Sequence, residues 1–285
     1  YRETWLDRFD GILLLWSLMR DWQPLTHLID RAIGSVAPAI VCRVEVDGAL
    51  LFEHCAGTLG ESTDSTGTDI LPVTSDTLFD YASLTKLFTA TACLVLVDHG
   101  HLGLETRLVD ILPEFGEHKL LGGAEDPITK QPLPADPRWQ IEPGWPWFDT
   151  SLVTIRSLLT HSSGLPAWRS VYRACGRVPH YSSLMQRAEQ QQRARSGLGA
   201  LLGYPFVYPP RKSYAYSDIG LMLLGEAIAA VYQSANGQKT GHGGLSQAID
   251  DLVTKPLGLS VHYLPDDALR SQIAPTELCR WRNRR

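Results

Sequence analysis

The order of apolar and polar residues predicts a strand hairpin early in the chain. Residues 39–46 are rich in β-branched side chains, and residues 50–57 form a second apolar run after Asp47 and Gly48. An Asp-Gly pair between two such runs is typical of a two-residue hairpin turn. We therefore expect an antiparallel pair of strands that opens a sheet.

Helical patterns precede and follow the hairpin. Helices are predicted before Gly34, over 87–97, 153–165, 185–196, 218–233 and 245–253. The run 87–97 carries no charge, which predicts a helix that is buried on all sides and ends at Gly100 and Gly103. In the 153–165 segment, Thr154 is the expected N-cap and Gly164 the expected C-terminal stop. These patterns divide the chain into an N-terminal helical segment, 1–34, and a main domain, 35–285.

Residues 122–149 hold an unusual concentration of proline and tryptophan. The prolines are Pro127, Pro132, Pro134, Pro137, Pro143 and Pro146, and the tryptophans are Trp139, Trp145 and Trp147. This density of proline predicts a loop without regular structure. Two interpretations stay open: an aromatic rim over a substrate cleft, or a surface lid packed on the core.

Composition indicates a globular protein and excludes several classes of function. The chain has 285 residues, is 44% hydrophobic and carries a formal net charge of −5, so nucleic acid is not an expected partner. We expect the basic end, 280–285, to be a solvated tail.

The apolar stretch 12–16 is too short to span a bilayer. The chain begins at Tyr1, which suggests that the true start lies elsewhere.

Cysteine and histidine patterns favour neither a disulfide framework nor a metal site. The five cysteines form no Cys-x-x-Cys pair and are expected to be free thiols, although Cys42 and Cys55 could approach each other across the hairpin. The nine histidines include no His-Glu-x-x-His pattern, so neither zinc nor any other cofactor is expected.

Ser83 and Lys86 form the strongest chemical pattern in the chain. Side chains three residues apart share one face of a helix, so Lys86 can reach the Ser83 hydroxyl and accept its proton. The helix N-terminus and desolvation both favour an uncharged lysine, which is a competent base. The competing interpretation is structural, with Ser83 as a helix cap and Lys86 as an exposed first-turn lysine.

His161 lies beside Ser162 and Ser163 at the end of a predicted helix. Adjacent residues at a helix end do not face each other, so a catalytic pair is disfavoured. We expect His161 to stabilise a turn.

Three segments together resemble the serine β-lactamase and penicillin-binding-protein superfamily. They are the Ser83–Lys86 pair, the segment 153–165 and the cluster Tyr216-Ser217-Asp218, and the likeness runs from about Ala37 to Glu277. It is greatest to the branch with class C β-lactamases, D-alanyl-D-alanine carboxypeptidases and β-lactamase-like esterases. The resemblance implies an α+β fold of the β-lactamase/transpeptidase type, with an antiparallel sheet flanked by helices and a helical lobe.

The same resemblance implies the roles of the site residues. Ser83 would be the acylated nucleophile and Lys86 its activating base. Tyr216 would give a proton to the leaving group and take one from the deacylating water. Asp218 stands where the family has asparagine. Its charge would favour the ammonium form of Lys86 and shift more of the base role to Tyr216.

Three departures from the family pattern concern the rest of the site. The family's third element, Lys-Thr-Gly or His-x-Gly, lies on a strand, whereas Lys239-Thr240-Gly241 lies in turn-forming sequence and is interpreted as a decoy. The C-terminal strands expected of the family are missing before Arg285. Arg211 also replaces the glycine that usually precedes the tyrosine motif.

The resulting hypothesis is a serine hydrolase that works through an acyl-enzyme on an ester, a D-amino-acid peptide or a β-lactam-like amide. A chain without the C-terminal strands is expected to be weakly active or inactive, since one lost oxyanion donor costs about a hundred- to a thousand-fold. The alternative is a non-catalytic module of the same fold that binds cell-wall peptide or another ligand. The expected partner is a small-molecule or peptide substrate. The resemblance favours the cell envelope or secretion, with a cytoplasmic location and the oligomeric state left open.

Overall fold

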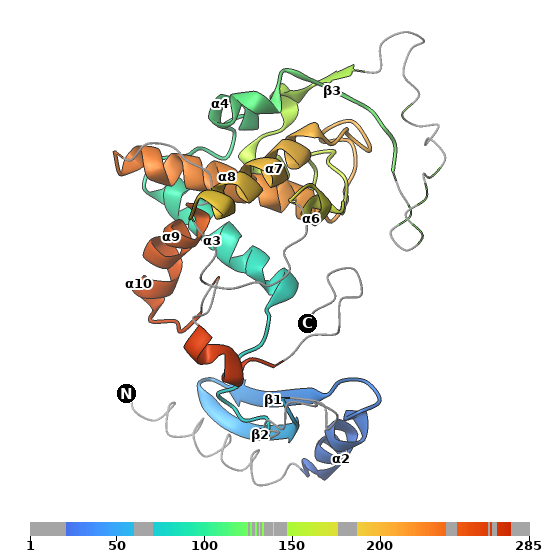
Figure 1. The fold of residues 1–285 in the computed structure, drawn as a ribbon, viewed down its shortest axis with the longest axis vertical. Coiled ribbons are helices and arrows are strands. Elements are labelled where there is room, and N and C mark those ends of the chain that lie inside the picture. The colour runs from blue at the N-terminus through green and yellow to red at the C-terminus, as the bar shows by residue number, and fades with distance from the viewer. Residues whose placement is uncertain are drawn as a thin grey trace, which may run out of the picture. The chain divides into compact units, whose positions relative to one another are not determined.

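The computed structural model describes residues 21–59, 71–124, 147–175, 187–237, 244–261 and 267–274, together with single positions 126, 129, 131, 133, 139 and 263. The chain divides into two compact units (Figure 1). One comprises Tyr1–Asp80 with Pro265–Arg285, and the other comprises Tyr81–Leu264. Each is described by itself.

The first unit contains helix α2 (Gln23–Ala32) and the hairpin of β1 (Ala39–Val46) and β2 (Ala49–Gly57). The strands pair antiparallel, with Val46 opposite Ala49. At the turn, Asp47 and Gly48 have φ of 49° and 78°, the two left-handed residues that a tight hairpin turn needs. The predicted hairpin is therefore confirmed. The 3₁₀ helix η6 (Asp267–Gln272) also belongs to this unit, and Leu78 forms a parallel bridge with Ile273.

The strand register keeps the two hairpin cysteines apart. Cys42 lies opposite His54, whereas Cys55 lies opposite Val41. Successive residues of a strand point to opposite faces, so the two thiols lie on different faces of the hairpin. Among the described residues, Cys42, Cys55, Cys93 and Cys175 form no disulfide.

The second unit is a helical lobe that also carries a small strand pair. Its elements in chain order are η1 (Ala82–Leu84), α3 (Thr85–Asp98), α4 (Leu108–Ile111), η2 (Pro113–Phe115), β3 (His118–Leu120), β4 (Trp147–Asp149), η4 (Thr150–Leu152), α5 (Ile155–Leu159), α6 (Val171–Ala174), α7 (Arg187–Gly203), α8 (Asp218–Ala235), α9 (Leu245–Ile249), the π-helix η5 (Asp250–Thr254) and α10 (Lys255–Leu257). Helices and antiparallel strands thus occur together, which confirms the predicted α+β class.

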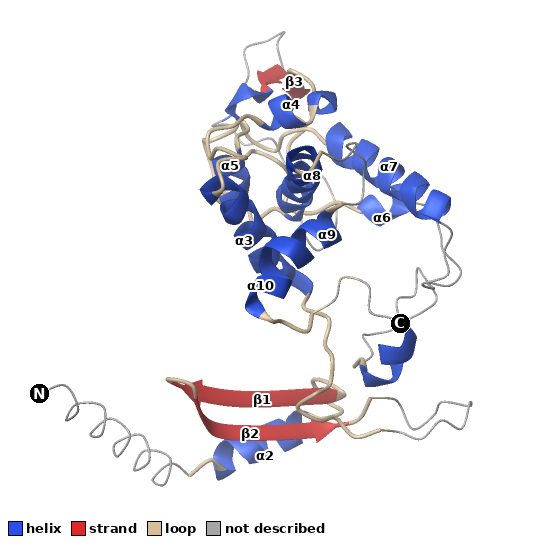
Figure 2. Cartoon of the chain, turned by 90° about the vertical axis from the view of Figure 1, so that its left-hand side faces the viewer, coloured by secondary structure: helices blue, strands red, loops and turns tan. Residues whose placement is uncertain are grey.

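Helix α8 is the centre of the lobe. It packs against α3, α4, α5, α7 and α9, and Figure 2 shows it surrounded by these helices. Its apolar residues Ile219, Leu223 and Ile228 are fully buried, as expected for a helix enclosed by others. The Ser217 hydroxyl accepts a hydrogen bond from the Gly220 amide at 2.9 Å and so fixes the first turn of α8.

Helix α3 differs from its prediction in one respect. Ala92, Cys93 and Leu96 are buried against the lobe, whereas Leu87 and Leu94 are 64% and 50% exposed. The prediction of burial on all sides is therefore wrong, because α3 packs against the lobe through one face. The predicted stop is confirmed, since α3 ends at Asp98 and Gly100 has a φ of 74°.

Several element boundaries also differ from the sequence-based expectation. Helix α7, predicted over 185–196, runs to Gly203. Helix α5 has the predicted Thr154 cap but ends at Leu159, because His161 and not Gly164 is the first residue after it in the left-handed region, with φ of 55°. Strand β4 occupies the end of the proline-rich segment that was expected to be irregular throughout. The last helix continues beyond Val253 through the π-helix and Pro256 and ends at Leu257, before the left-handed Gly258.

Several predictions fall on residues outside the described set. They concern 12–16, most of the segment 122–149, the Lys239-Thr240-Gly241 turn, Cys279 and the tail 280–285. In the part of the chain that the structure describes, no helix is long and apolar enough to cross a membrane.

Lys119 is a buried cation that the sequence patterns did not reveal. It lies on β3, is 7% exposed, and donates hydrogen bonds to the carbonyls of Leu202 and Tyr204 at the end of α7. Its ammonium also lies 4.5 Å from the centre of the Phe115 ring. A cation at a helix C-terminus is favourable, but burial lowers the pKa of Lys119 to about 8.

This burial predicts a specific dependence of stability on pH. Between pH 8 and pH 10.5, the unfolded chain holds the Lys119 proton and the folded chain releases it, so stability rises with pH. The gain from this group is about 3 kcal/mol at most. Urea unfolding of wild type and Lys119→Met at several pH values in this window isolates the effect. We expect the difference in unfolding free energy between them to grow with pH in favour of the wild type. Parallel curves would contradict the burial.

Candidate active site

Ser83 and Lys86 meet at the start of α3, as their spacing predicts. Ser83 lies in the 3₁₀ turn η1, and Lys86 is the second residue of α3. The Lys86 Nζ donates a hydrogen bond to the Ser83 Oγ at 3.0 Å. Ser83 is exposed, so an acyl group can approach its hydroxyl. Ala82, just before it, has a φ of 43°, a strained backbone value of the kind that gathers at functional sites.

Asp218 sets the charge of Lys86. Its Oδ1 lies 2.6 Å from the Lys86 Nζ, and the two side chains are 30% and 19% exposed, so solvent screens the pair only partly. Burial pulls the pKa of Lys86 down, but the contacts with Asp218 and then Tyr216 outweigh it and the pKa of Lys86 is raised. Spacing and the helix N-terminus alone favoured an uncharged Lys86, whereas the charged Lys86 expected from Asp218 in the family pattern agrees with this direction.

Tyr216 completes the group around Lys86. The Lys86 Nζ lies 4.7 Å from the centre of the Tyr216 ring, and the ring is 46% exposed. Hydrogen bonds with Ser83 and then Lys86 lower the pKa of the Tyr216 phenol, while the charge of Asp218 opposes the shift. The structure thus brings together the four predicted residues, Ser83, Lys86, Tyr216 and Asp218, in one cluster.

Two loops hold Tyr216 in place by backbone pairing. One is residues 161–167, which follow α5, and the other is residues 206–218, which lead into α8. Their hydrogen bonds run from Val207 N to Gly164 O (2.8 Å), Arg211 N to Ser162 O (2.7 Å), Ala215 N to His161 O (3.1 Å) and Asp218 N to Ala167 O (2.7 Å). The Ser217 Oγ adds a bond to Pro166 O at 2.7 Å. We call residues 161–167 and 206–218 the paired loops.

Gly164 is required where the paired loops approach most closely. Its φ is 81°, and a Cβ there would lie 2.4 Å from the Tyr208 carbonyl oxygen. No side chain fits at that distance, and L-residues disfavour this conformation. The glycine in the Ser-Ser-Gly segment therefore permits the contact that positions Tyr216.

His161 contacts Tyr216 from the side of the first paired loop. Its ring centre lies 4.7 Å from that of Tyr216 and 5.9 Å from that of Tyr214. The Nδ1 atom accepts a hydrogen bond from the Ser217 backbone amide at 3.0 Å. These contacts agree with the expected turn-stabilising role.

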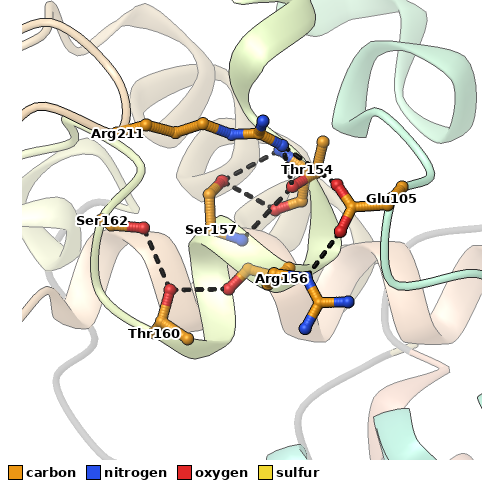
Figure 3. A network of polar contacts seen from close by, with 7 residues as sticks. All are labelled: Glu105, Thr154, Arg156, Ser157, Thr160, Ser162 and Arg211. Carbon is orange, nitrogen blue, oxygen red and sulfur yellow. Dashed lines mark hydrogen bonds and ion pairs between the residues drawn. The ribbon is translucent and has the colours of Figure 1, made fainter.

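Arg211 lies in the second paired loop with a φ of 63°, which explains why glycine is the usual residue at this position of the family pattern. Its Nη2 donates to the Glu105 carboxylate at 3.1 Å and to the Thr154 hydroxyl at 3.2 Å. Glu105 also accepts from Arg156 Nε at 2.5 Å. Figure 3 shows Glu105 between the two arginines, beside the start of α5.

The Glu105 network was missed by sequence reasoning, since its members lie far apart in the chain and form no motif. Hydrogen bonds with Arg156 and Arg211 lower the pKa of the Glu105 carboxyl. Glu105 and Arg211 side chains are 62% and 45% exposed, so their ion pair adds little to stability. The network instead fixes the second paired loop against α5.

The described residues hold no group of three or more His, Cys, Asp or Glu side chains arranged to bind a metal ion.

Comparison with known proteins supports one family. The chain is 30% identical over 230 residues to Esterase EstB of Burkholderia gladioli, covering 80% of this chain and 46% of that protein. It is 27% identical over 242 residues to Penicillin-binding protein 4 of Amycolatopsis lactamdurans, covering 85% and 49% respectively. The chain thus spans about half the length of these relatives.

A solved structure shows the same fold. The class C beta lactamase from Rhodobacter sphaeroides superposes with a TM-score of 0.54 at 19% identity, over 89% of this chain and 54% of that one. The family model for beta-lactamase matches residues 29–272, which include the Ser83 cluster and both paired loops. The chain therefore belongs to the beta-lactamase family.

Proposed function

We propose that this protein is a serine hydrolase that forms an acyl-enzyme on Ser83, with Tyr216 as the proton acceptor. The observation that carries the proposal is the position of the Lys86 ammonium. It contacts the Ser83 hydroxyl at 3.0 Å and the Asp218 carboxylate at 2.6 Å, and it lies 4.7 Å from the centre of the Tyr216 ring. An ammonium has three N–H donors and no acceptor, so these contacts leave Lys86 no lone pair with which to take the serine proton.

Tyr216 is the better base in this arrangement. Its pKa is lowered by the hydrogen bond with Ser83 and by Lys86, which brings the phenol closer to ionisation at neutral pH. Lys86 then acts as the cation that stabilises the phenolate, and Asp218 keeps Lys86 charged. This assigns to Tyr216 the base role that the family resemblance gives first to Lys86.

The reaction follows from these positions. The Ser83 Oγ attacks the acyl carbon while its proton passes to the Tyr216 oxygen. The bond to the leaving group breaks, and the leaving oxygen or nitrogen takes that proton from Tyr216. Water then attacks the acyl-Ser83 ester and gives a proton to Tyr216, and the Ser83 oxygen leaves and recovers it. The products are a free acid and an alcohol or amine.

The substrate class we propose is an ester, a D-amino-acid peptide or a β-lactam-like amide. Each offers an acyl carbon to Ser83 and a leaving group that a tyrosine can protonate. The proposal is supported by relatives named as an esterase and a penicillin-binding protein. The shape of the acyl pocket selects among the three.

A covalent serine probe tests the nucleophile. We expect a fluorophosphonate or a fluorescent penicillin to label the wild-type protein and to fail on Ser83→Ala, because the acylated oxygen is gone. Ser246, exposed on α9, offers a matched control, and Ser246→Ala should label like the wild type. A wild-type protein that folds and never labels would contradict an acyl-enzyme on this chain, and would support either a non-catalytic binding module or the inactivity expected of a chain without the C-terminal strands.

Asp218→Asn tests the electrostatic roles. Asp218 raises the pKa of Lys86 and, through its charge, opposes the lowering of the pKa of Tyr216. Removing the charge lowers both pKa values, so both limbs of the pH profile for probe labelling should move to lower pH. The amide preserves size, which separates charge from packing. An unchanged profile, or a shift to higher pH, would contradict the assignment.

A further inference from the structure

His161 is the residue at the site that the proposed reaction does not use. Its ring packs on Tyr216, and its Nδ1 binds the backbone amide of Ser217, the residue that joins Tyr216 to α8. Its carbonyl oxygen receives the Ala215 amide at 3.1 Å and the Tyr208 hydroxyl at 3.2 Å. One residue therefore contacts Tyr216 itself and the backbone on both sides of it.

The hydrogen bond to Ser217 defines the protonation state of the ring. A backbone amide only donates, so Nδ1 must be an acceptor and the imidazole must be neutral, with its proton on Nε2. A second proton on Nδ1 would face the Ser217 N–H and break this bond. The backbone of His161 is unusual as well, because its φ of 55° favours glycine or asparagine.

We infer that His161 is the positioning residue for Tyr216, and that protonation of its imidazole releases Tyr216 and switches the site off in acid. The inference rests on the proposed function, because it concerns the base of that reaction. Positioning matters because a displaced general base loses its hydrogen-bond reach to the nucleophile.

The charges around His161 oppose its protonation. Burial lowers the pKa of His161 from its ordinary 6.5, the Lys86 cation on α3 lowers it further, and the Asp218 carboxylate on α8 partly counters them. From the second paired loop, Tyr208 bonds the carbonyl of His161, and Tyr214 and Tyr216 contact its ring. The switch therefore operates below the pH at which a free histidine titrates.

Two variants separate the acceptor from the titration. In His161→Asn, asparagine tolerates the left-handed backbone, and its Oδ1 is a hydrogen-bond acceptor at the same place along the side chain as Nδ1. Unlike the imidazole, the amide cannot be protonated between about pH 4 and pH 9. His161→Gly also accepts the backbone and has no acceptor. The readout is the rate of fluorophosphonate labelling of Ser83 between about pH 4 and pH 9, with circular dichroism at each pH to confirm folding.

In the wild type, where only Tyr216 gains a proton as the pH falls, the labelling rate should drop about tenfold per pH unit. At the lower pH where His161 gains a proton as well, the rate should drop about a hundredfold per pH unit. His161→Asn should return the acid limb to about tenfold per unit. His161→Gly should lower the rate roughly 10- to 100-fold at the plateau, and by more than His161→Asn does. An acid limb of the same steepness in wild type and His161→Asn overturns the inference.

A measurement without catalysis keeps the inference separate from the proposed function. In an NMR titration of the wild type, the ring resonances of Tyr216 should shift with the same midpoint as the His161 imidazole, below 6.5, and this coupled shift should vanish in His161→Asn. If the protein never labels at any pH but shows this coupling, the proposed function fails and the positioning role stands. If Tyr216 does not respond to His161, the positioning role fails even where labelling succeeds.

Discussion

The site depends on a single ammonium group shared among three oxygens. Lys86 joins the serine at the start of α3, the carboxylate at the start of α8 and the tyrosine of the loop between α7 and α8. A charged lysine satisfies all three contacts at once, whereas a neutral amine would leave the Asp218 carboxylate, whose Oδ1 is buried, without its cation. The charge on Lys86 thus fixes both the geometry of the cluster and the direction in which the serine proton can move.

The rest of the lobe keeps these three oxygens in place. Helix α8 is enclosed by its neighbours, so Asp218 is held by the core and not by a mobile loop. The paired loops hold Tyr216 through backbone bonds, and Gly164 permits their close approach. The Glu105 network contacts Arg211, whose backbone is in the left-handed conformation that arginine disfavours. Positioning in this protein comes mainly from the backbone, which explains how an exposed tyrosine can still have a defined orientation.

Features encoded by neighbouring residues could be predicted from the sequence. Asp47 and Gly48 specify the hairpin turn, and the spacing of Ser83 and Lys86 places their side chains together. The Thr154 cap follows from the same kind of local rule. Features that depend on distant segments could not be predicted in this way. The local pattern around Lys86 favoured an uncharged amine, and only Asp218, which reaches it from another helix, indicated the ammonium. The left-handed His161 ended α5 before the glycine that was expected to do so.

The central claim is that the phenol of Tyr216 and not the amine of Lys86 is the group that loses its proton first. It is tested most directly by NMR titration of the protein labelled with ¹³C at the tyrosine ζ carbon, with Tyr216→Phe to assign the signal. Our account predicts that Tyr216 ionises below the ordinary tyrosine pKa of 10 while Lys86 stays charged. Ionisation of Tyr216 at or above 10, after Lys86 has become neutral, would contradict it.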